Sequence, residues 1–148
     1  MSFKKIFGAI NPEPPFMLRS IDAMQAILIR ERARADRNYH QFSVIVFDLG
    51  NEANNVVTIK KLDQFLSTGL RTIDEAGWFA KNQIGIILPY TRAGDATKLA
   101  ERIQAGMKDI APLDSLCIYK YPSVWPFNKK SKQKNVARKP KRIAKQLA

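Results

Sequence analysis

The feature that most constrains this chain is a pair of strand-like runs separated by only two residues. The runs cover residues 73–80 and 83–88, and Lys81 and Asn82 lie between them, a spacing that predicts a tight hairpin. Apolar residues at helical spacing precede and follow the pair. A hairpin set between two helical connections indicates a sheet with helices packed on it.

The other elements follow from apolar spacing and from residues that begin or end helices. We expect a helix after Ser20, a nearly continuous apolar strand over 42–47 covered on both faces, and an Asn-rich turn leading to a helix that ends near Gly69. Thr91 is the expected cap of a third helix, and residues 116–121 form a last strand. The order α-β-α-β-β-α-β predicts an α/β (α+β) sandwich of ferredoxin-like type with a central mixed sheet.

Composition and length indicate one soluble domain. The 148 residues are enough for a single core, and no apolar run approaches a bilayer span. We expect a leader over 1–16, which contains the proline-rich stretch 11–15, a domain over 17–127, and a tail over 128–148. The start has neither the long apolar stretch nor the cleavage pattern of a signal peptide, so we expect a cytoplasmic protein.

The net charge of +12 belongs to the tail. Without the nine tail residues the body carries 16 basic and 13 acidic side chains, and residues 129–145 contain no acidic one. Three interpretations stay open: a solvated end, binding to an anionic membrane surface, and binding to nucleic acid. No aromatic residue follows Phe127, which weakens base stacking and favours membrane over nucleic acid. The basic tail residues are Lys129, Lys130, Lys132, Lys134, Arg138, Lys139, Lys141, Arg142 and Lys145.

The sequence offers no constellation for nucleophilic or metal catalysis. The single cysteine, Cys117, lies in an apolar run and is interpreted as a core thiol, and the single histidine, His40, lies in a predicted loop. We expect no cofactor and no catalytic residue.

Four segments, in order, resemble the GGDEF domains of bacterial diguanylate cyclases. They are the helix end and strand at 31–49, Arg71-Thr-Ile-Asp74, the strand at 86–91 and the helix at 98–103. The similarity runs from Ser20 to about Ile110 and implies the nucleotide-cyclase-like version of the predicted sandwich.

The resemblance also implies that the cyclase chemistry is lost. Counting from Asp74, Ala80-Lys-Asn-Gln-Ile84 stands where the family has its Gly-Gly-Asp/Glu-Glu-Phe signature. Of the expected metal carboxylates only Asp48 remains, since the other positions hold Gly50 and Asn82, and Gln83 replaces the glutamate that reads guanine. Asp48 is therefore interpreted as a relic ligand position, and the chain as no enzyme.

Arg71 and Asp74 match the family's inhibitory site, where the arginine binds cyclic di-GMP. The alternatives are a surface ion pair at the start of a strand, or a relic. Trp78 and Phe79, which follow, are interpreted as core or interface aromatics, and the stretch 121–127 either as a docking surface or as a segment folded back on the sheet.

Asp74-Glu-Ala-Gly-Trp78 resembles degenerate domains found beside bacterial sugar transferases that begin exopolysaccharide synthesis. The resemblance implies a noncatalytic regulatory or interaction module, with cyclic di-GMP or a protein of polysaccharide synthesis as partner, at the inner face of the membrane. The alternative is a nucleic-acid-binding or membrane-surface-binding protein that acts through its tail.

Overall fold

The computed structural model describes residues 18–113 and 115–122. The predicted order of helices and strands is confirmed, and one short 3-10 helix, η2, is added. The predicted leader, the tail and most of the stretch 121–127 lie outside the described residues. The elements are α1 (Ile21–Asn38), β1 (Phe42–Asp48), η2 (Gly50–Asn54), α2 (Val56–Gly69), β2 (Glu75–Ala80), β3 (Gln83–Pro89), α3 (Ala93–Met107) and β4 (Leu116–Tyr121).

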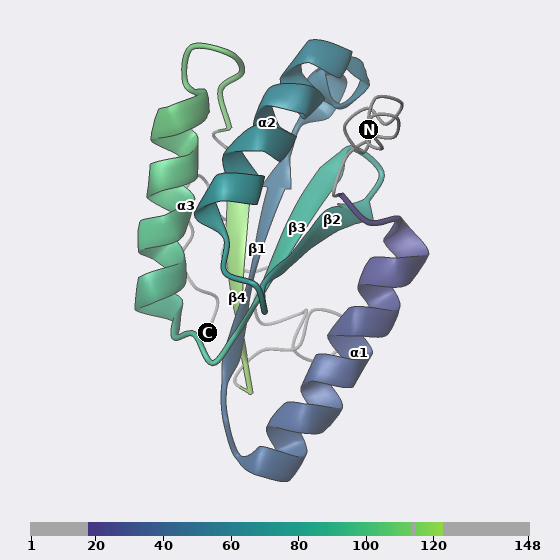
Figure 1. Ribbon diagram of the computed structural model, residues 1–148, viewed down its shortest axis with the longest axis vertical. Coiled ribbons are helices and arrows are strands. Elements are labelled where there is room, and N and C mark those ends of the chain that lie inside the picture. Colours follow the sequence, from purple (N-terminus) through teal and green to yellow (C-terminus); the bar gives the residue numbers. More distant parts are fainter. Residues whose placement is uncertain (1–17, 114, 123–148) are drawn as a thin grey trace, which may run out of the picture.

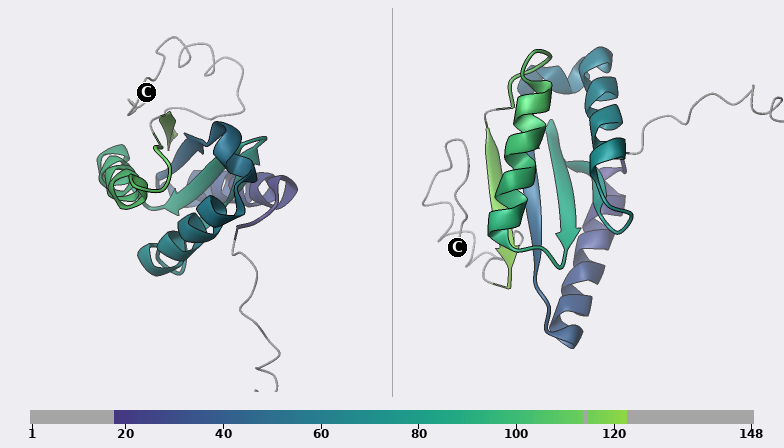
Figure 2. Two further views of the ribbon diagram at one scale, coloured as in Figure 1. Left: turned by 90° about the horizontal axis from the view of Figure 1, so that it is seen from above. Right: turned by 60° about the vertical axis from the view of Figure 1, so that its left-hand side comes forward.

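The four strands form one sheet in the order β2-β3-β1-β4 (Figures 1 and 2). Every neighbouring pair is antiparallel, so the prediction of a mixed sheet is wrong. The reason lies in the connections. Helix α2 links β1 to β2, and α3 links β3 to β4, and each helix carries the chain past one intervening strand. The strands joined by a helix run in the same direction, but an opposite strand lies between them.

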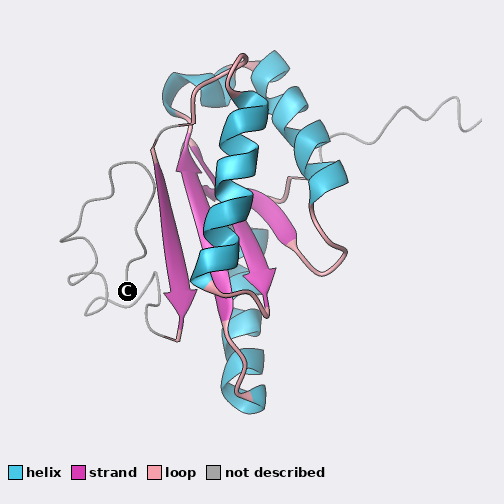
Figure 3. Cartoon of the chain, turned by 90° about the vertical axis from the view of Figure 1, so that its left-hand side faces the viewer, coloured by secondary structure: helices cyan, strands magenta, loops and turns pink. Residues whose placement is uncertain are grey.

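Strand β1 is covered on both faces, as its apolar run predicts. Ile45 and Phe47 belong to the cluster formed with α2 and α3, whereas Phe42, Val44 and Val46 belong to the cluster formed with α1. Figure 3 shows α2 and α3 in front of the sheet and α1 behind it. The alternation follows from the period of two along a strand.

The helix ends test the capping predictions. Ser20 caps α1, since its Oγ accepts from the amide of Ala23 at 3.1 Å, and α2 ends at Gly69 as expected. Thr91 does not cap α3. The N-cap is Arg92, and the Thr91 side chain is buried with its hydroxyl donating to the carbonyl of Pro89 at 3.0 Å. The Thr91 hydroxyl bonds to this backbone carbonyl and does not accept from the first amides of α3.

Strand β2 begins at Glu75, two residues later than predicted, because residues 71–74 form a turn. Its centre is covered by Arg19, which pairs with Gly77 as an isolated parallel bridge. A Cβ on Gly77 would lie 2.6 Å from the Arg19 carbonyl oxygen, so this approach requires glycine. Trp78 packs against the α2 and α3 cluster and Phe79 against the α1 cluster. Both side chains are partly buried at the margin of the core, in agreement with their prediction as core or interface aromatics.

None of the helices in the described part of the chain is long and apolar enough to cross a membrane.

Candidate functional site

Arg71 and Asp74 form a closed turn at the start of β2. The carboxylate of Asp74 accepts from the backbone amide of Arg71 at 2.8 Å, from Nε at 3.1 and 3.2 Å, and from Nη2 at 2.7 Å. The Asp74 amide donates back to the Arg71 carbonyl at 3.0 Å. A carboxylate bound by two guanidinium nitrogens and an amide holds the arginine in one orientation.

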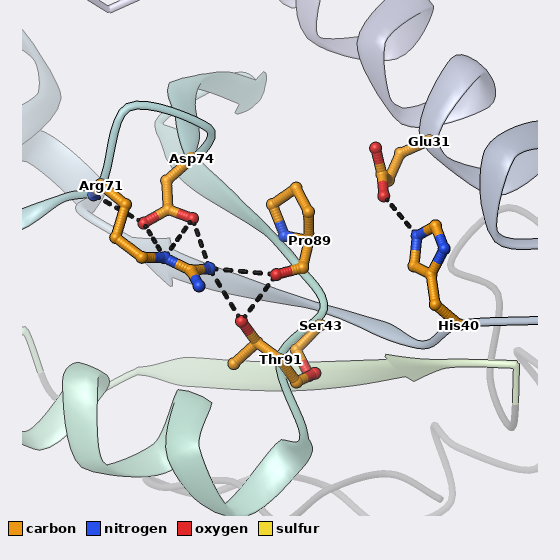
Figure 4. Close-up of polar contacts among 7 residues, drawn as sticks. All are labelled: Glu31, His40, Ser43, Arg71, Asp74, Pro89 and Thr91. Carbon is orange, nitrogen blue, oxygen red and sulfur yellow. Dashed lines mark hydrogen bonds and ion pairs between the residues drawn. The ribbon is translucent and has the colours of Figure 1, made fainter. Parts of the chain in front are cut away.

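The guanidinium also reaches the far end of β3. Nη2 of Arg71 donates to the carbonyl of Pro89 at 3.0 Å and to Oγ1 of Thr91 at 3.0 Å (Figure 4). Oγ of Ser43 donates to the carbonyl of Thr91 at 2.8 Å. The loop before β2, the turn after β3 and the start of β1 are therefore linked by one polar network.

The two partners differ in exposure. The Asp74 side chain is 3% exposed and the Arg71 side chain 51%. The hydrogen bonds that the Arg71 guanidinium donates to the Asp74 carboxylate raise the pKa of Arg71 above its ordinary value, and the opposing effect of burial is smaller. Nη1 makes no hydrogen bond within the described residues, so a charged, fixed donor edge faces solvent. This is the arrangement that a phosphate or carboxylate group can bind.

The residues at the signature position lie at the opposite end of β2. Ala80 pairs with Gln83, and Lys81 and Asn82 form the hairpin turn, as predicted. Asn82 has a left-handed φ of 62°, which asparagine tolerates better than most residues. Its carbonyl accepts from the amide of Leu49 at 2.8 Å, which ties the turn to the end of β1.

Asp48 lies beside this turn, as the resemblance requires. It is the last residue of β1, it is directly opposite Gln83 in the register, and its side chain is exposed. Its Oδ1 accepts from the amide of Gly50 at 3.0 Å. The structure thus brings together Asp48, Gly50, Asn82 and Gln83, with a single carboxylate among them.

The predicted site residues therefore form two groups, Arg71 with Asp74 at one end of β2 and Asp48 with the hairpin at the other. Within the described ranges, no three His, Cys, Asp or Glu side chains gather in a way that could hold a metal ion. Cys117, expected in the core, is only partly buried on β4. The basic tail residues lie outside the described residues.

Sequence reasoning missed the partners of Arg71. Pro89 and Thr91 lie 18 and 20 positions after it, and neither carries a local signal of this contact. In the sequence, Pro89 falls within the strand-like segment 86–91, and Thr91 is predicted only as a helix cap. The contact depends on antiparallel pairing of β2 with β3, which places the start of one strand beside the end of the other.

No protein-family model matches the chain, and no curated protein sequence matches it. Solved structures do. The GGDEF domain of YfiN (TpbB) from Pseudomonas aeruginosa superposes with a TM-score of 0.66 at 18% identity, over 88% of this chain and 97% of that domain. The fold is that of a GGDEF domain.

Two further GGDEF structures agree with this assignment of the fold. The active GGEEF domain of a diguanylate cyclase from Vibrio cholerae gives a TM-score of 0.65 at 16% identity, covering 88% of this chain and 98% of that chain. The GGDEF domain of DgcB from Caulobacter crescentus, solved in complex with c-di-GMP, gives 0.64 at 13%, covering 88% and 91%. The GGDEF-like fold and the resemblance in sequence thus coincide, and at these identities the likeness concerns the fold alone.

Proposed function

We propose that the chain is a noncatalytic regulatory module derived from a diguanylate cyclase domain, and that it binds cyclic di-GMP through Arg71. The observation that carries the proposal is the guanidinium of Arg71, half exposed and held by the buried carboxylate of Asp74. Binding to a fixed arginine avoids the entropy lost when a free side chain is ordered. The complex of the DgcB domain with c-di-GMP supports the choice of ligand for this fold.

The loss of catalysis is proposed from the residues beside the hairpin. Two-metal chemistry on a triphosphate needs several anionic oxygens close together. Here Asp48 stands with Gly50, Asn82 and Gln83, and its carboxylate already accepts from a backbone amide. One exposed carboxylate supplies too little negative charge to hold Mg²⁺ against a nucleotide.

The test of ligand binding is calorimetric titration of the full chain with cyclic di-GMP, with cyclic di-AMP as the reference nucleotide. We expect binding of cyclic di-GMP to weaken at least tenfold in Arg71→Ala, since a hydrogen bond to a charged group is worth about 1.5–3 kcal/mol. Arg102→Ala is the matched control, because Arg102 is an exposed arginine on α3. Each variant is first checked for folding by its melting temperature.

Two results would count against the proposal. One is the absence of any heat or spectral change with cyclic di-GMP in a folded full chain. The other is equal binding by Arg71→Ala and the wild type, which would place the ligand elsewhere. Equal affinity for cyclic di-GMP and cyclic di-AMP would show that the site does not select guanine. It would still be consistent with an arginine that binds phosphate.

A link to exopolysaccharide synthesis is proposed from the segment Asp74–Trp78. Its residues have structural roles in this fold, since Asp74 holds Arg71, Glu75 pairs with Arg19 at 2.7 Å, and Trp78 packs on the core. The segment therefore supports a shared domain type with the degenerate domains beside sugar transferases. Co-purification of the chain with a transferase of its own host tests this link.

The basic tail supports a second proposed activity, attachment to anionic membrane at the inner face. Nine cations near such a surface contribute up to about 1 kcal/mol each. Vesicles with anionic lipid are compared with random-sequence DNA and RNA at one ionic strength, because salt weakens both kinds of binding. We expect vesicle binding at least as strong as nucleic-acid binding, and loss of both on deleting residues 129–148. Tighter nucleic-acid binding that survives the deletion would contradict it.

A further inference from the structure

A second candidate site lies on the other side of the turn after β3. A cleft of about 690 Å³ opens between the end of α1 and the ends of β3 and β4. Its volume falls within the range typical of small-molecule sites. Among the side chains that line it are Tyr39, His40, Tyr90, Lys120, Tyr121 and Pro122.

His40 is the buried polar group of this cleft. Its side chain is 9% exposed, and Nε2 lies 2.9 Å from the carboxylate of Glu31, which is itself buried (Figure 4). Nδ1 is buried and has no hydrogen-bond partner within the described residues. Buried side-chain nitrogens almost always have a partner, so Nδ1 is a position where a bound molecule would complete the structure. With Nε2–H donating to Glu31, the neutral ring presents Nδ1 as an acceptor.

Two tyrosines beside His40 are held in unfavourable backbone conformations. Tyr39 and Tyr90 both have a φ of 56°, in the left-handed region that favours glycine or asparagine. Tyr39 is 94% exposed, so burial offsets almost none of its strain, and Tyr90 is 61% exposed with one stacked contact to His40. Strained residues concentrate at functional sites, and here both carry an aromatic ring at the same cleft.

The rings define the shape of a ligand. The ring of Tyr90 lies 4.0 Å from that of His40, centroid to centroid, with 27° between their planes. A planar group that meets Nδ1 edge-on lies in the imidazole plane, and therefore runs nearly parallel to Tyr90. Tyr121 forms a fixed wall, since its hydroxyl donates to Asp36 at 2.6 Å and its ring stacks on Phe42.

The charge of the lining defines the rest. The Asp36 carboxylate accepts a hydrogen bond from the Tyr121 hydroxyl, and its Oδ2 lies 3.9 Å from Nε of Arg32. Lys120 makes no hydrogen bond or ion pair with any described residue, so its ammonium is the uncommitted charge of the cleft. An anionic substituent on the ligand would complement it.

We propose that this cleft binds a planar heteroaromatic anion of the mononucleotide class. Its ring lies along Tyr90, its polar edge donates to Nδ1 of His40, and its phosphate faces Lys120. The site is distinct from Arg71, whose guanidinium holds Pro89 and Thr91 from the other side of the turn. The inference does not depend on binding of cyclic di-GMP.

The single histidine of the chain gives the test an unambiguous probe. The full chain, labelled with nitrogen-15, is titrated with AMP, GMP, CMP and UMP, and the imidazole nitrogens are followed by long-range proton–nitrogen correlation. We expect at least one nucleotide to move the Nδ1 resonance in a saturable way. Tyr90→Gly removes the ring, suits the local φ, and should weaken binding about tenfold, as expected for the loss of one stacking surface.

Two further variants separate the contributions. Lys120→Gln should weaken binding of the nucleotide but leave binding of the matching nucleoside unchanged. Asn82→Gly is the control, because it also replaces a residue of positive φ with glycine, at the opposite end of the sheet. Its affinity should equal that of the wild type.

The proposal is overturned if millimolar nucleotide leaves the His40 resonances unmoved, or if Tyr90→Gly binds as tightly as the wild type. The same movement with inorganic phosphate alone would overturn the assignment of an aromatic ligand. All variants are compared at equal folded fraction, measured by circular dichroism.

Discussion

Arg71 donates from Nη2 to the carbonyl oxygen of Pro89 at 3.0 Å, and this bond ties the loop before β2 to the turn after β3. The same guanidinium neutralises the buried carboxylate of Asp74. Arg71 therefore has a structural role whether or not it binds a ligand. The two roles separate experimentally, because stability is measured without ligand.

Replacing Arg71 with alanine should destabilise the domain by about 2 kcal/mol, since it leaves a buried carboxylate without its cation. The value is below that of a fully buried pair because half of the arginine side chain is exposed. Urea unfolding of the full chain measures the change. Adding Asp74→Asn to Arg71→Ala should recover part of the loss, since the amide carries no charge. A double variant no more stable than the single one would argue against the charge as the cause.

Gly77→Ala should lower the free energy of unfolding by about 2 kcal/mol or more, because the new Cβ would lie 2.6 Å from the Arg19 carbonyl oxygen and 2.7 Å from Cγ of Met24. The backbone atom cannot move aside as a flexible side chain can. Gly94→Ala is the matched control, since a Cβ there meets nothing within 4 Å and Gly94 lies in α3. In thermal unfolding, the Gly94→Ala protein should be as stable as the wild type or slightly more stable. An equal loss of stability in Gly77→Ala and Gly94→Ala would contradict the steric explanation.

Tyr39→Gly should stabilise the domain by about 1 kcal/mol, since left-handed backbone costs an L-residue roughly that much. Tyr39 is the C-cap of α1, with a φ of 56° and a side chain that buries almost nothing. Differential scanning calorimetry measures the change in melting temperature. Tyr39→Ala, which removes the ring but keeps the strain, should give no such gain.

Stability should fall with rising pH in the alkaline range because of Tyr119. Burial, with a further effect of Cys117, raises the pKa of Tyr119 to about 12. Between the ordinary tyrosine value of about 10 and this value, the folded protein keeps a proton that the unfolded chain has lost. The contribution of Tyr119 to the free energy of unfolding is therefore complete below pH 10 and is lost by about pH 12. Its full size is on the order of 2–3 kcal/mol.

Unfolding in urea at several alkaline pH values measures this slope for the wild type and for Tyr119→Phe. The stability of Tyr119→Phe should fall less steeply with rising pH than that of the wild type. In the absorbance titration of its tyrosines, the variant should lack the transition that belongs to Tyr119. Equal slopes for the two proteins would assign the pH dependence to other groups.

The full chain should make no cyclic di-GMP from GTP with Mg²⁺ or Mn²⁺, because Asp48 alone among the family's expected metal-ligand positions carries a carboxylate, whereas the others hold Gly50 and Asn82. Product is measured by chromatography, with an active diguanylate cyclase as the positive control. Product that forms with the wild type and disappears in Asp48→Ala would show that a single carboxylate is enough.

Local sequence signals predicted the elements well. Only two residues separate the runs of β2 and β3, which favours a hairpin. The run over 42–47, apolar except for Ser43, favours a strand covered on both faces. The alignment with the family's signature, counted from Asp74, places Ala80 at the hairpin where the structure has it.

What the sequence could not predict depends on distant contacts. The antiparallel sheet follows from which strands become neighbours, and local pattern does not encode that choice. Glu31 has the sequence context of a surface charge on an arginine-rich helix, yet it is buried against His40. Thr91 has the residue type of a helix cap, but a carbonyl two positions earlier takes its hydroxyl.

The bridge between Arg19 and Gly77 has a consequence for how the sheet meets other chains. The amide of Arg19 donates to the Ala76 carbonyl at 3.1 Å, and the Trp78 amide donates to the Arg19 carbonyl at 2.9 Å. These are the outward-facing backbone groups at the middle of β2, one of the two margins of the sheet. A foreign strand cannot extend the sheet there without first displacing residue 19. A strand from another chain would therefore pair more easily with β4, the strand at the opposite margin of the sheet.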